Sequence, residues 1–153
     1  MRLSTFSDYC LRVLMYLGEQ ADRLSTVAEI ARAHDISESH LTKVVHQLGR
    51  SGYVDTLRGK GGGMRLARAP REIVLGEVLR QTETDFALVE CFGDEPHCYM
   101  EGACQLQAVL GEALGAMFRV LDGYTLADLL QRPDGSTRVL AFAPRAAGGG
   151  RIG

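Results

Sequence analysis

The sequence predicts a mainly α-helical protein that carries one small β-hairpin. Apolar residues recur at helical three- to four-residue spacing over most of the first 50 residues and again after residue 104. Between these regions, a glycine-rich run separates two short segments with strand character, which is typical of a hairpin. Three of the four cysteines fall within 91–104, in a run with Gly, Pro and Asp that disfavours regular structure. The sequence therefore combines a small helical domain, a hairpin, a cysteine loop and a long helix.

The size and composition of the chain allow one large or two small folded domains. It has 153 residues, of which 46% are hydrophobic, so it can bury a core. No apolar run approaches the roughly 20 residues that span a bilayer, so we expect no membrane partner. The polar amino terminus does not resemble a signal peptide, and we expect a cytoplasmic protein. In a reducing compartment the cysteines favour metal or redox chemistry over disulfides.

Residues 5–19 have the spacing of an amphipathic helix capped by Ser4 or Thr5. Asp8 lies in the first turn, where a carboxylate interacts favourably with the helix dipole. This is the simplest role for Asp8 on the residues alone. Cys10 falls among the apolar positions, which predicts a buried, inert thiol rather than a ligand.

Two further helices follow in close succession. Thr26 and Glu29 form a capping-box pattern at the start of a helix over 27–34. A tight connection then leads to a second helix over 38–50, whose apolar residues share one face. Two short helices joined by a tight turn match the helix-turn-helix arrangement.

The outer face of the second helix predicts contact with DNA. It presents polar and basic side chains that can bond to base edges, namely Ser39, His40, Thr42 and Lys43. The net charge of the chain is −2, but residues 38–68 hold six Lys/Arg and only two Asp/Glu. This local basic patch permits nucleic-acid binding. The alternative is an ordinary solvated face on a three-helix core.

A basic, glycine-rich turn separates the predicted strands 53–57 and 64–67. Its backbone could approach a phosphate chain closely, as the wing of a winged-helix domain does. We expect the main wing contacts to come from Arg58, Gly59 and Lys60, with Arg2 and Arg65 as weaker phosphate candidates. The run is not a nucleotide-binding P-loop, because no Gly-Lys-Ser/Thr ending and no helix follow it.

The second half of the chain divides at the cysteines. A helix over 74–81 completes a DNA-binding domain of residues 1–82, and the cysteine loop occupies 83–105. A long helix with a broad apolar stripe, followed by a short helix capped by Thr125, occupies 104–132 and predicts a dimer interface. Residues 133–153 are rich in Gly, Ala and Arg and predict a disordered tail.

Cys91, Cys98 and Cys104 gather three soft ligands within a short span. Thiolates of this kind bind iron–sulfur clusters or zinc, and a nitrogen of His97 could complete a tetrahedral zinc site. Zinc would make the site a structural part of a DNA-binding module. No nucleophile–base motif or phosphate loop is evident, so we do not expect an enzyme.

These features together resemble those of bacterial winged-helix transcription regulators that carry iron–sulfur clusters. The resemblance covers about residues 1–132 and rests on the opening Met1-Arg2-Leu3, the segment 57–63 with Leu66, the three cysteines, and Thr125-Leu126-Ala127-Asp128-Leu129. It implies a homodimeric repressor that binds a double-stranded DNA operator under the control of its cluster.

The resemblance also implies a ligand set. One subgroup of the family has a histidine three residues after the third cysteine, where this chain has Gln107. A subgroup that senses nitric oxide uses an aspartate in the first helix, supplied by the other subunit, and Asp8 matches it. The resemblance thus favours a [4Fe–4S] cluster held by the three cysteines and by Asp8 of the partner subunit. A [2Fe–2S] regulator of iron or cluster status is the alternative, and His97 is the rival fourth ligand.

Overall fold

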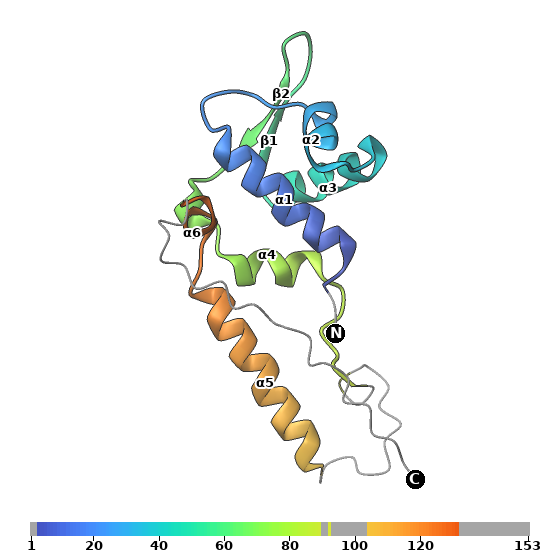
Figure 1. Cartoon of the computed structure of the whole chain (residues 1–153), viewed down its shortest axis with the longest axis vertical. Helices are drawn as coiled ribbons and strands as arrows, with labels where there is room; N and C mark the ends of the chain where they lie inside the picture. Colours follow the sequence, from blue (N-terminus) through green and yellow to red (C-terminus); the bar gives the residue numbers. More distant parts are fainter. Residues whose placement is uncertain (1–2, 90–91, 93–103, 132–153) are drawn as a thin grey trace, which may run out of the picture.

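The computed structural model describes residues 3–89, 92 and 104–131 of the chain. The helices of residues 5–50 and the hairpin lie in the upper part of Figure 1, and the helix that begins at residue 105 lies at the bottom. The helices are α1 (Thr5–Glu19), α2 (Val27–His34), α3 (Glu38–Arg50), α4 (Leu75–Thr82), α5 (Gln105–Asp122) and α6 (Leu126–Leu130). The strands are β1 (Val54–Leu57) and β2 (Gly63–Leu66), and a short 3-10 helix, η1, spans Pro70–Glu72.

The predicted fold class is confirmed, and local capping signals begin the first three helices. The Oγ of Ser4 accepts a hydrogen bond from the Ser7 amide at 3.1 Å and so begins α1. The predicted capping box of Thr26 begins α2, and Ser37 caps α3. Asp35 takes the left-handed conformation, with φ 53°, and ends α2.

The hairpin is antiparallel, with Val54 opposite Leu66 and Leu57 opposite Gly63. The sequence predicts a strand that begins at residue 53, but β1 begins at Val54, because the Tyr53 amide donates to the Leu48 carbonyl in the turn after α3. Two hydrogen bonds between Ser25 and Met64 join the hairpin to the segment before α2. The wing is thus anchored to the helix-turn-helix.

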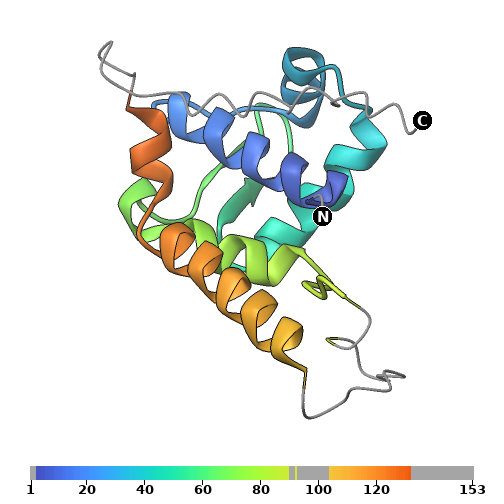
Figure 2. The ribbon, with the colours of Figure 1, turned by 60° about the horizontal axis from the view of Figure 1, so that its bottom comes forward.

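Helix α1 lies at the centre of the core. Its buried residues pack against α2, α3, α4 and α6. Figure 2 shows the ribbons of these helices around α1. Fully buried side chains of this core are Val13, Leu14, Ile30, Leu41, Val44, Leu48, Tyr53, Ile73, Val78 and Leu126. At roughly 25 cal/mol per Å² of buried apolar surface, this cluster is the main favourable contribution to folding.

Helix α6 returns to the DNA-binding domain after α5. The Leu126 amide donates to the Ile73 carbonyl at 2.8 Å, and the Leu75 amide donates to the Tyr124 carbonyl at 3.0 Å. Leu126 is fully buried, and the side chain of Leu130 fills the space beside Gly18 of α1. The segment before α4 and the segment after α5 are therefore joined to each other, next to the core. None of the described helices is long and apolar enough to cross a membrane.

Candidate DNA interface and metal-ligand positions

The outer face of α3 exposes all four residues that the sequence assigns to DNA reading: Ser39, His40, Thr42 and Lys43. The opposite face of α3 is buried in the core, so the helix can present only this side to a ligand. The Thr42 hydroxyl donates to the Glu38 carbonyl at 2.8 Å, which leaves its oxygen able to accept a hydrogen bond. Of these four side chains Lys43 carries a positive charge, and the others can donate and accept hydrogen bonds.

The wing turn exposes Arg58, Gly59 and Lys60 at the tip of the hairpin. Gly59 and Gly61 have φ angles of 103° and 78°, in a region that glycine enters without strain. A side chain at Gly62 would overlap the carbonyl oxygen of Leu57. The glycines therefore bring two cationic side chains to the end of a narrow turn.

Arg68 fixes the root of the wing, although no sequence motif marks this position. Its guanidinium donates to the Gly52 carbonyl at 2.9 Å and to the Ser51 carbonyl at 3.2 Å. The same group lies 4.9 Å from the centroid of the Tyr53 ring. The carbonyls that Arg68 binds lie 16 and 17 residues away, so no local pattern could reveal its role.

The two weaker phosphate candidates have different outcomes. Arg65 is exposed on β2, directly opposite Asp55 in the strand register. The negative charge of Asp55 on the neighbouring strand partly offsets the positive charge of Arg65 and so reduces its attraction for phosphate. Arg2 lies outside the described residues.

Of the three predicted cysteine ligands, Cys104 is described, and it immediately precedes α5. Cys91 and Cys98 lie outside the described residues, as does the rival ligand His97. The neighbour of Cys91, Phe92, is described, and its ring reaches Gly111 of α5, to within 3.9 Å of the position that a Cβ would take. Residue 92 is therefore held beside the amino-terminal half of the helix that Cys104 begins.

Asp8 lies on the surface of α1, with its side chain 46% exposed. The Nε of Arg12 donates to its Oδ2 at 2.9 Å, one turn along the helix. The four-residue spacing of an acid and a base on one helix is a sequence signal for such a pair. Exposed pairs of this kind contribute at most about 1 kcal/mol, so a stronger partner can displace Arg12 from the carboxylate.

The start of α1 is tied to the end of α4. The Ser4 amide donates to Oε1 of Glu83 at 2.7 Å, and the buried hydroxyl of Ser7 donates to Oγ1 of Thr82 at 2.8 Å. Since the chain runs from Thr82 toward Cys91, the helix that carries Asp8 is joined directly to the segment that leads to the cysteines. This junction was not evident in the sequence, because its partners lie 75 and 79 residues apart.

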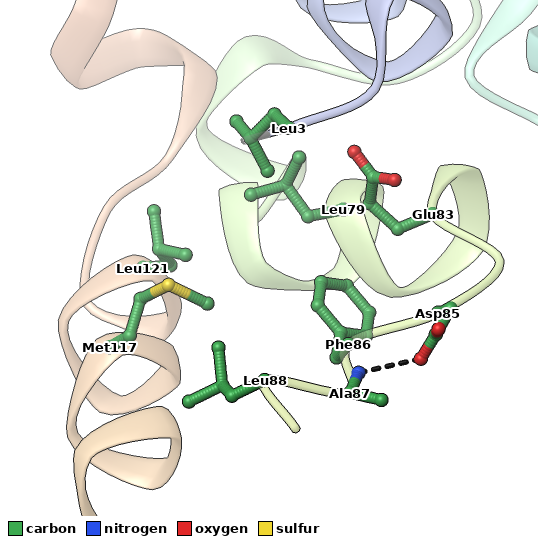
Figure 3. A pocket seen from close by; sticks show the side chains of 9 residues that line it. All are labelled: Leu3, Leu79, Glu83, Asp85, Phe86, Ala87, Leu88, Met117 and Leu121. Carbon is green, nitrogen blue, oxygen red and sulfur yellow. Dashed lines mark hydrogen bonds between the residues drawn. The ribbon is translucent and has the colours of Figure 1, made fainter. Parts of the chain in front are cut away.

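A pocket of about 330 Å³ separates α4 and the following segment from α5 (Figure 3). Leu79, Met117 and Leu121 lie on its two helical walls, and Phe86 and Leu88 come from the segment after α4. In that segment, the Ala87 amide donates to the Asp85 carboxylate at 2.6 Å and turns the chain. The pocket is largely apolar, and the segment before Cys91 forms part of its wall.

Beyond the pocket, α5 is held by contacts at its carboxyl-terminal half. Arg80 donates two hydrogen bonds to Asp122, at 2.6 and 2.8 Å, and its guanidinium lies 4.3 Å from the Phe118 ring centroid. Phe86 meets the same Phe118 ring edge-on, at 4.8 Å between centroids. No described residue of α5 is buried, and its large apolar side chains Leu106, Val109 and Val120 are each 60% exposed.

The donor set fits an iron–sulfur cluster in its chemistry, since it offers cysteine thiolates and an accessible carboxylate. Within residues 3–89, 92 and 104–131, no three His, Cys, Asp or Glu side chains gather into a metal-binding group. The first turns of α1 and α5 also lie well apart in both views of the ribbon. Asp8 and Cys104 of one chain are thus carried by separate parts of the molecule.

The exposed α3 face, the basic wing and the core that orients them form the arrangement of a winged helix-turn-helix DNA-binding protein. Residues 3–132 match the family model Rrf2, described as an iron-dependent transcriptional regulator. The chain belongs to the Rrf2 family, which confirms the resemblance noted in the sequence.

Similar proteins agree with this assignment. The chain is 47% identical to the HTH-type transcriptional regulator NsrR of Halalkalibacterium halodurans, over 94% of this chain and 100% of that protein. It is 50% identical to the regulator of the same name from Geobacillus kaustophilus, over 86% of this chain and 90% of that one. Among solved structures, T. potens IscR aligns with a TM-score of 0.68 and 27% identity, over 85% of this chain and 86% of that chain.

Proposed function

We propose that this regulator is a homodimeric repressor whose affinity for operator DNA is set by a [4Fe–4S] cluster that responds to nitric oxide. The observation that carries the proposal is the placement of the candidate ligands on separate elements. Asp8 is an accessible carboxylate on the first helix of the DNA-binding domain, whereas Cys104 begins the helix that projects from it. A ligand set of this kind would tie two parts of a dimer together.

In this proposal the DNA is read by α3 and the wing. Ser39, His40, Thr42 and Lys43 would face the major groove, because they occupy the one side of α3 that the core leaves exposed. Arg58 and Lys60, with the backbone at Gly59, would contact the groove or the phosphates from the wing tip. Arg2 and Arg65 remain weaker phosphate candidates.

The cluster would be held by Cys91, Cys98 and Cys104 of one subunit and by the partner subunit's Asp8. When bound, the cluster supplies iron that reacts with nitric oxide. To ligate it, Asp8 would exchange its exposed ion pair with Arg12 for the metal. Loss of the bond between Asp8 and the cluster would return the Asp8 carboxylate to Arg12. It would also release α1, and with it the helix-turn-helix, from the other subunit.

The second subunit would pack on the exposed face of α5. Val109 and Val120 are eleven residues apart, or about three helical turns, so they share one side of the helix with Leu106 nearby. Exposure of large apolar side chains in a row is typical of an interface. A two-fold axis here would place two α3 helices for the two halves of an operator.

The DNA side of the proposal is tested by Arg58→Ala, since Arg58 is exposed at the tip of the wing. We expect weaker operator binding with unchanged cluster absorption. Arg71→Ala, an exposed residue at the 3-10 helix away from the wing, is the matched charge control. Unchanged affinity in the Arg58→Ala protein would remove this residue from the interface.

The metal side is tested by anaerobic purification, with iron and sulfide assays and an absorption spectrum before and after stoichiometric nitric oxide. We expect about four iron and about four sulfide per chain, with bleaching and loss of DNA binding on addition of nitric oxide. About two of each, or an unresponsive cluster, would favour the [2Fe–2S] regulator of iron status. Zinc without sulfide would reject the sensor in favour of a structural site.

A further inference from the structure

Tyr9 of α1 lies against His40 of α3, one of the residues on the DNA-reading face. The two ring centroids are 6.4 Å apart, and the ring planes are inclined by 47°. Aromatic rings interact favourably at separations of about 4.5–7 Å. Tyr9 is half-buried against the core, whereas His40 is exposed, so the better-anchored ring can restrict the more mobile one.

A second tyrosine on the same face of α1 makes a corresponding contact with α2. Tyr16 is seven residues, or nearly two turns, from Tyr9, and its ring meets His34 edge-on at 5.9 Å. Its hydroxyl also donates to Glu29 at 2.8 Å. One face of α1 thus contacts both helices of the helix-turn-helix, but only the Tyr9 contact reaches a side chain that faces DNA.

The contact controls the His40 side chain rather than its backbone. The His40 amide is already held by the capping oxygen of Ser37, at 3.4 Å, in the first turn of α3. The remaining freedom is in the side-chain torsions, which decide where the ring nitrogens point. A neighbouring ring that favours one rotamer therefore lowers the entropy lost when His40 binds DNA.

We propose that Tyr9 is a positioning residue for DNA recognition, which holds the His40 ring in the orientation that α3 presents to the operator. Tyr9 follows Asp8 directly in the same helix turn. If Asp8 binds the cluster, as the proposed function requires, a shift of α1 at Asp8 moves Tyr9 as well and changes the support under His40. The transmission of a shift from Asp8 rests on the proposed function, whereas the positioning of His40 by Tyr9 does not.

The test is a double-mutant cycle on DNA binding. The variants are Tyr9→Leu, His40→Leu and the pair, and the probe is a duplex selected from a random-sequence pool by the wild-type protein. Affinity is measured by fluorescence anisotropy for this duplex and for duplexes with single base-pair changes. Thermal unfolding of each variant checks its fold, and the exposed His40→Leu change should leave the core intact.

We expect Tyr9→Leu to weaken binding to the selected duplex on the order of 3- to 10-fold, the range of a single aromatic contact. The loss should disappear in the His40→Leu background, and Tyr9→Phe, which keeps the ring, should restore binding. Tyr16→Leu is the matched control, since it removes the corresponding contact with α2 without touching His40. It should change thermal stability but not the ranking of the altered duplexes.

An equal loss from Tyr9→Leu with and without His40 would overturn the proposal, because Tyr9 would then act only through general stability. The same would follow if Tyr16→Leu gave a His40-dependent loss. Running the cycle on metal-loaded and metal-free protein separates the two steps. If the Tyr9–His40 coupling energy is equal in both forms, positioning is supported and transmission from Asp8 is rejected. If the wild-type protein binds DNA equally well with and without metal, only the proposed function is rejected.

Discussion

The wing turn provides a prediction whose magnitude can be worked from the structure: Gly62→Ala should disable the wing while the helical core stays folded. A Cβ at this position would overlap the Leu57 carbonyl oxygen and lie 3.0 Å from the Gly59 carbonyl oxygen. Both obstacles are backbone atoms, so a rotamer change cannot relieve them. The turn must open, which breaks the hydrogen bond from the Gly62 amide to the Gly59 carbonyl.

The cost has two parts. Overpacking typically costs about 1–3 kcal/mol, and a broken hydrogen bond costs about 0.5–1.5 kcal/mol. The two costs are not added, because opening the turn relieves the overlap when it breaks the hydrogen bond. We therefore expect about 1–3 kcal/mol, confined to the hairpin. A two-stranded hairpin is only marginally stable by itself. Arg68 holds its root, and Ser25 bonds to Met64 within β2, so the turn beyond Gly63 should yield first.

The functional consequence is measurable from the salt dependence of operator binding. If the open turn withdraws Arg58 and Lys60 from the DNA backbone, the slope of log K against log salt should fall by about 0.9 for each phosphate that the wing no longer neutralises. Gly49→Ala is the matched control: its Cβ would meet the Val54 carbonyl at an ordinary 3.6 Å, inside a helix. That change should instead stabilise the protein by about 0.5–1 kcal/mol. Wild-type affinity and slope in the Gly62→Ala protein would refute the reasoning.

Three further predictions concern the core and its surface. Leu14→Ala should lower the free energy of unfolding by about 2–5 kcal/mol in urea titrations, since Leu14 is fully buried, and a decrease below about 1 kcal/mol would contradict its place in the core. Hydrogen bonds from Arg23 and Tyr16 hold the pKa of Glu29 at about 2, below its usual 4.5. Its contribution to stability is therefore full above pH 4.5 and lost as the pH falls toward 2. The urea midpoint of the Glu29→Gln protein should accordingly depend less on pH between 4.5 and 2 than that of the wild type. Burial raises the pKa of the Cys10 thiol to about 12, so iodoacetamide should label Cys10 only after unfolding, as read by mass spectrometry; rapid labelling of the folded protein would show that the thiol is accessible.

Local signals made the helices predictable. Ser4, Thr26 and Ser37 each satisfy amides of the turn that follows, and these interactions span only three residues, so the sequence reveals them. The start of the first strand was displaced by one residue for a physical reason. Tyr53 has the β-propensity of an aromatic residue, but its amide donates to the Leu48 carbonyl in the turn after α3, so the strand begins one residue later.

Long-range contacts were not predictable in the same way. The short helix α6 was expected from Thr125, but nothing in its own pattern indicates that Leu126 and Leu130 pack onto the DNA-binding domain. Arg68 likewise has no motif, because it binds backbone carbonyls, which every residue has. The exposure of the predicted DNA-reading residues of α3 could be foreseen, because the apolar positions determine which face of the helix remains outside.

The start of α1 explains how one short segment can serve three purposes at once. Ser7, Asp8 and Tyr9 are consecutive, and successive residues of a helix point about 100° apart. Ser7 accordingly bonds to Thr82 of α4, Asp8 faces solvent beside Arg12, and Tyr9 lies against His40 of α3. Because the three residues share one turn of backbone, a displacement of that turn shifts all three side chains. A displacement of α1 at Asp8 would therefore act on the α4 junction and on the His40 contact together, and would link the candidate ligand to the proposed DNA-reading face.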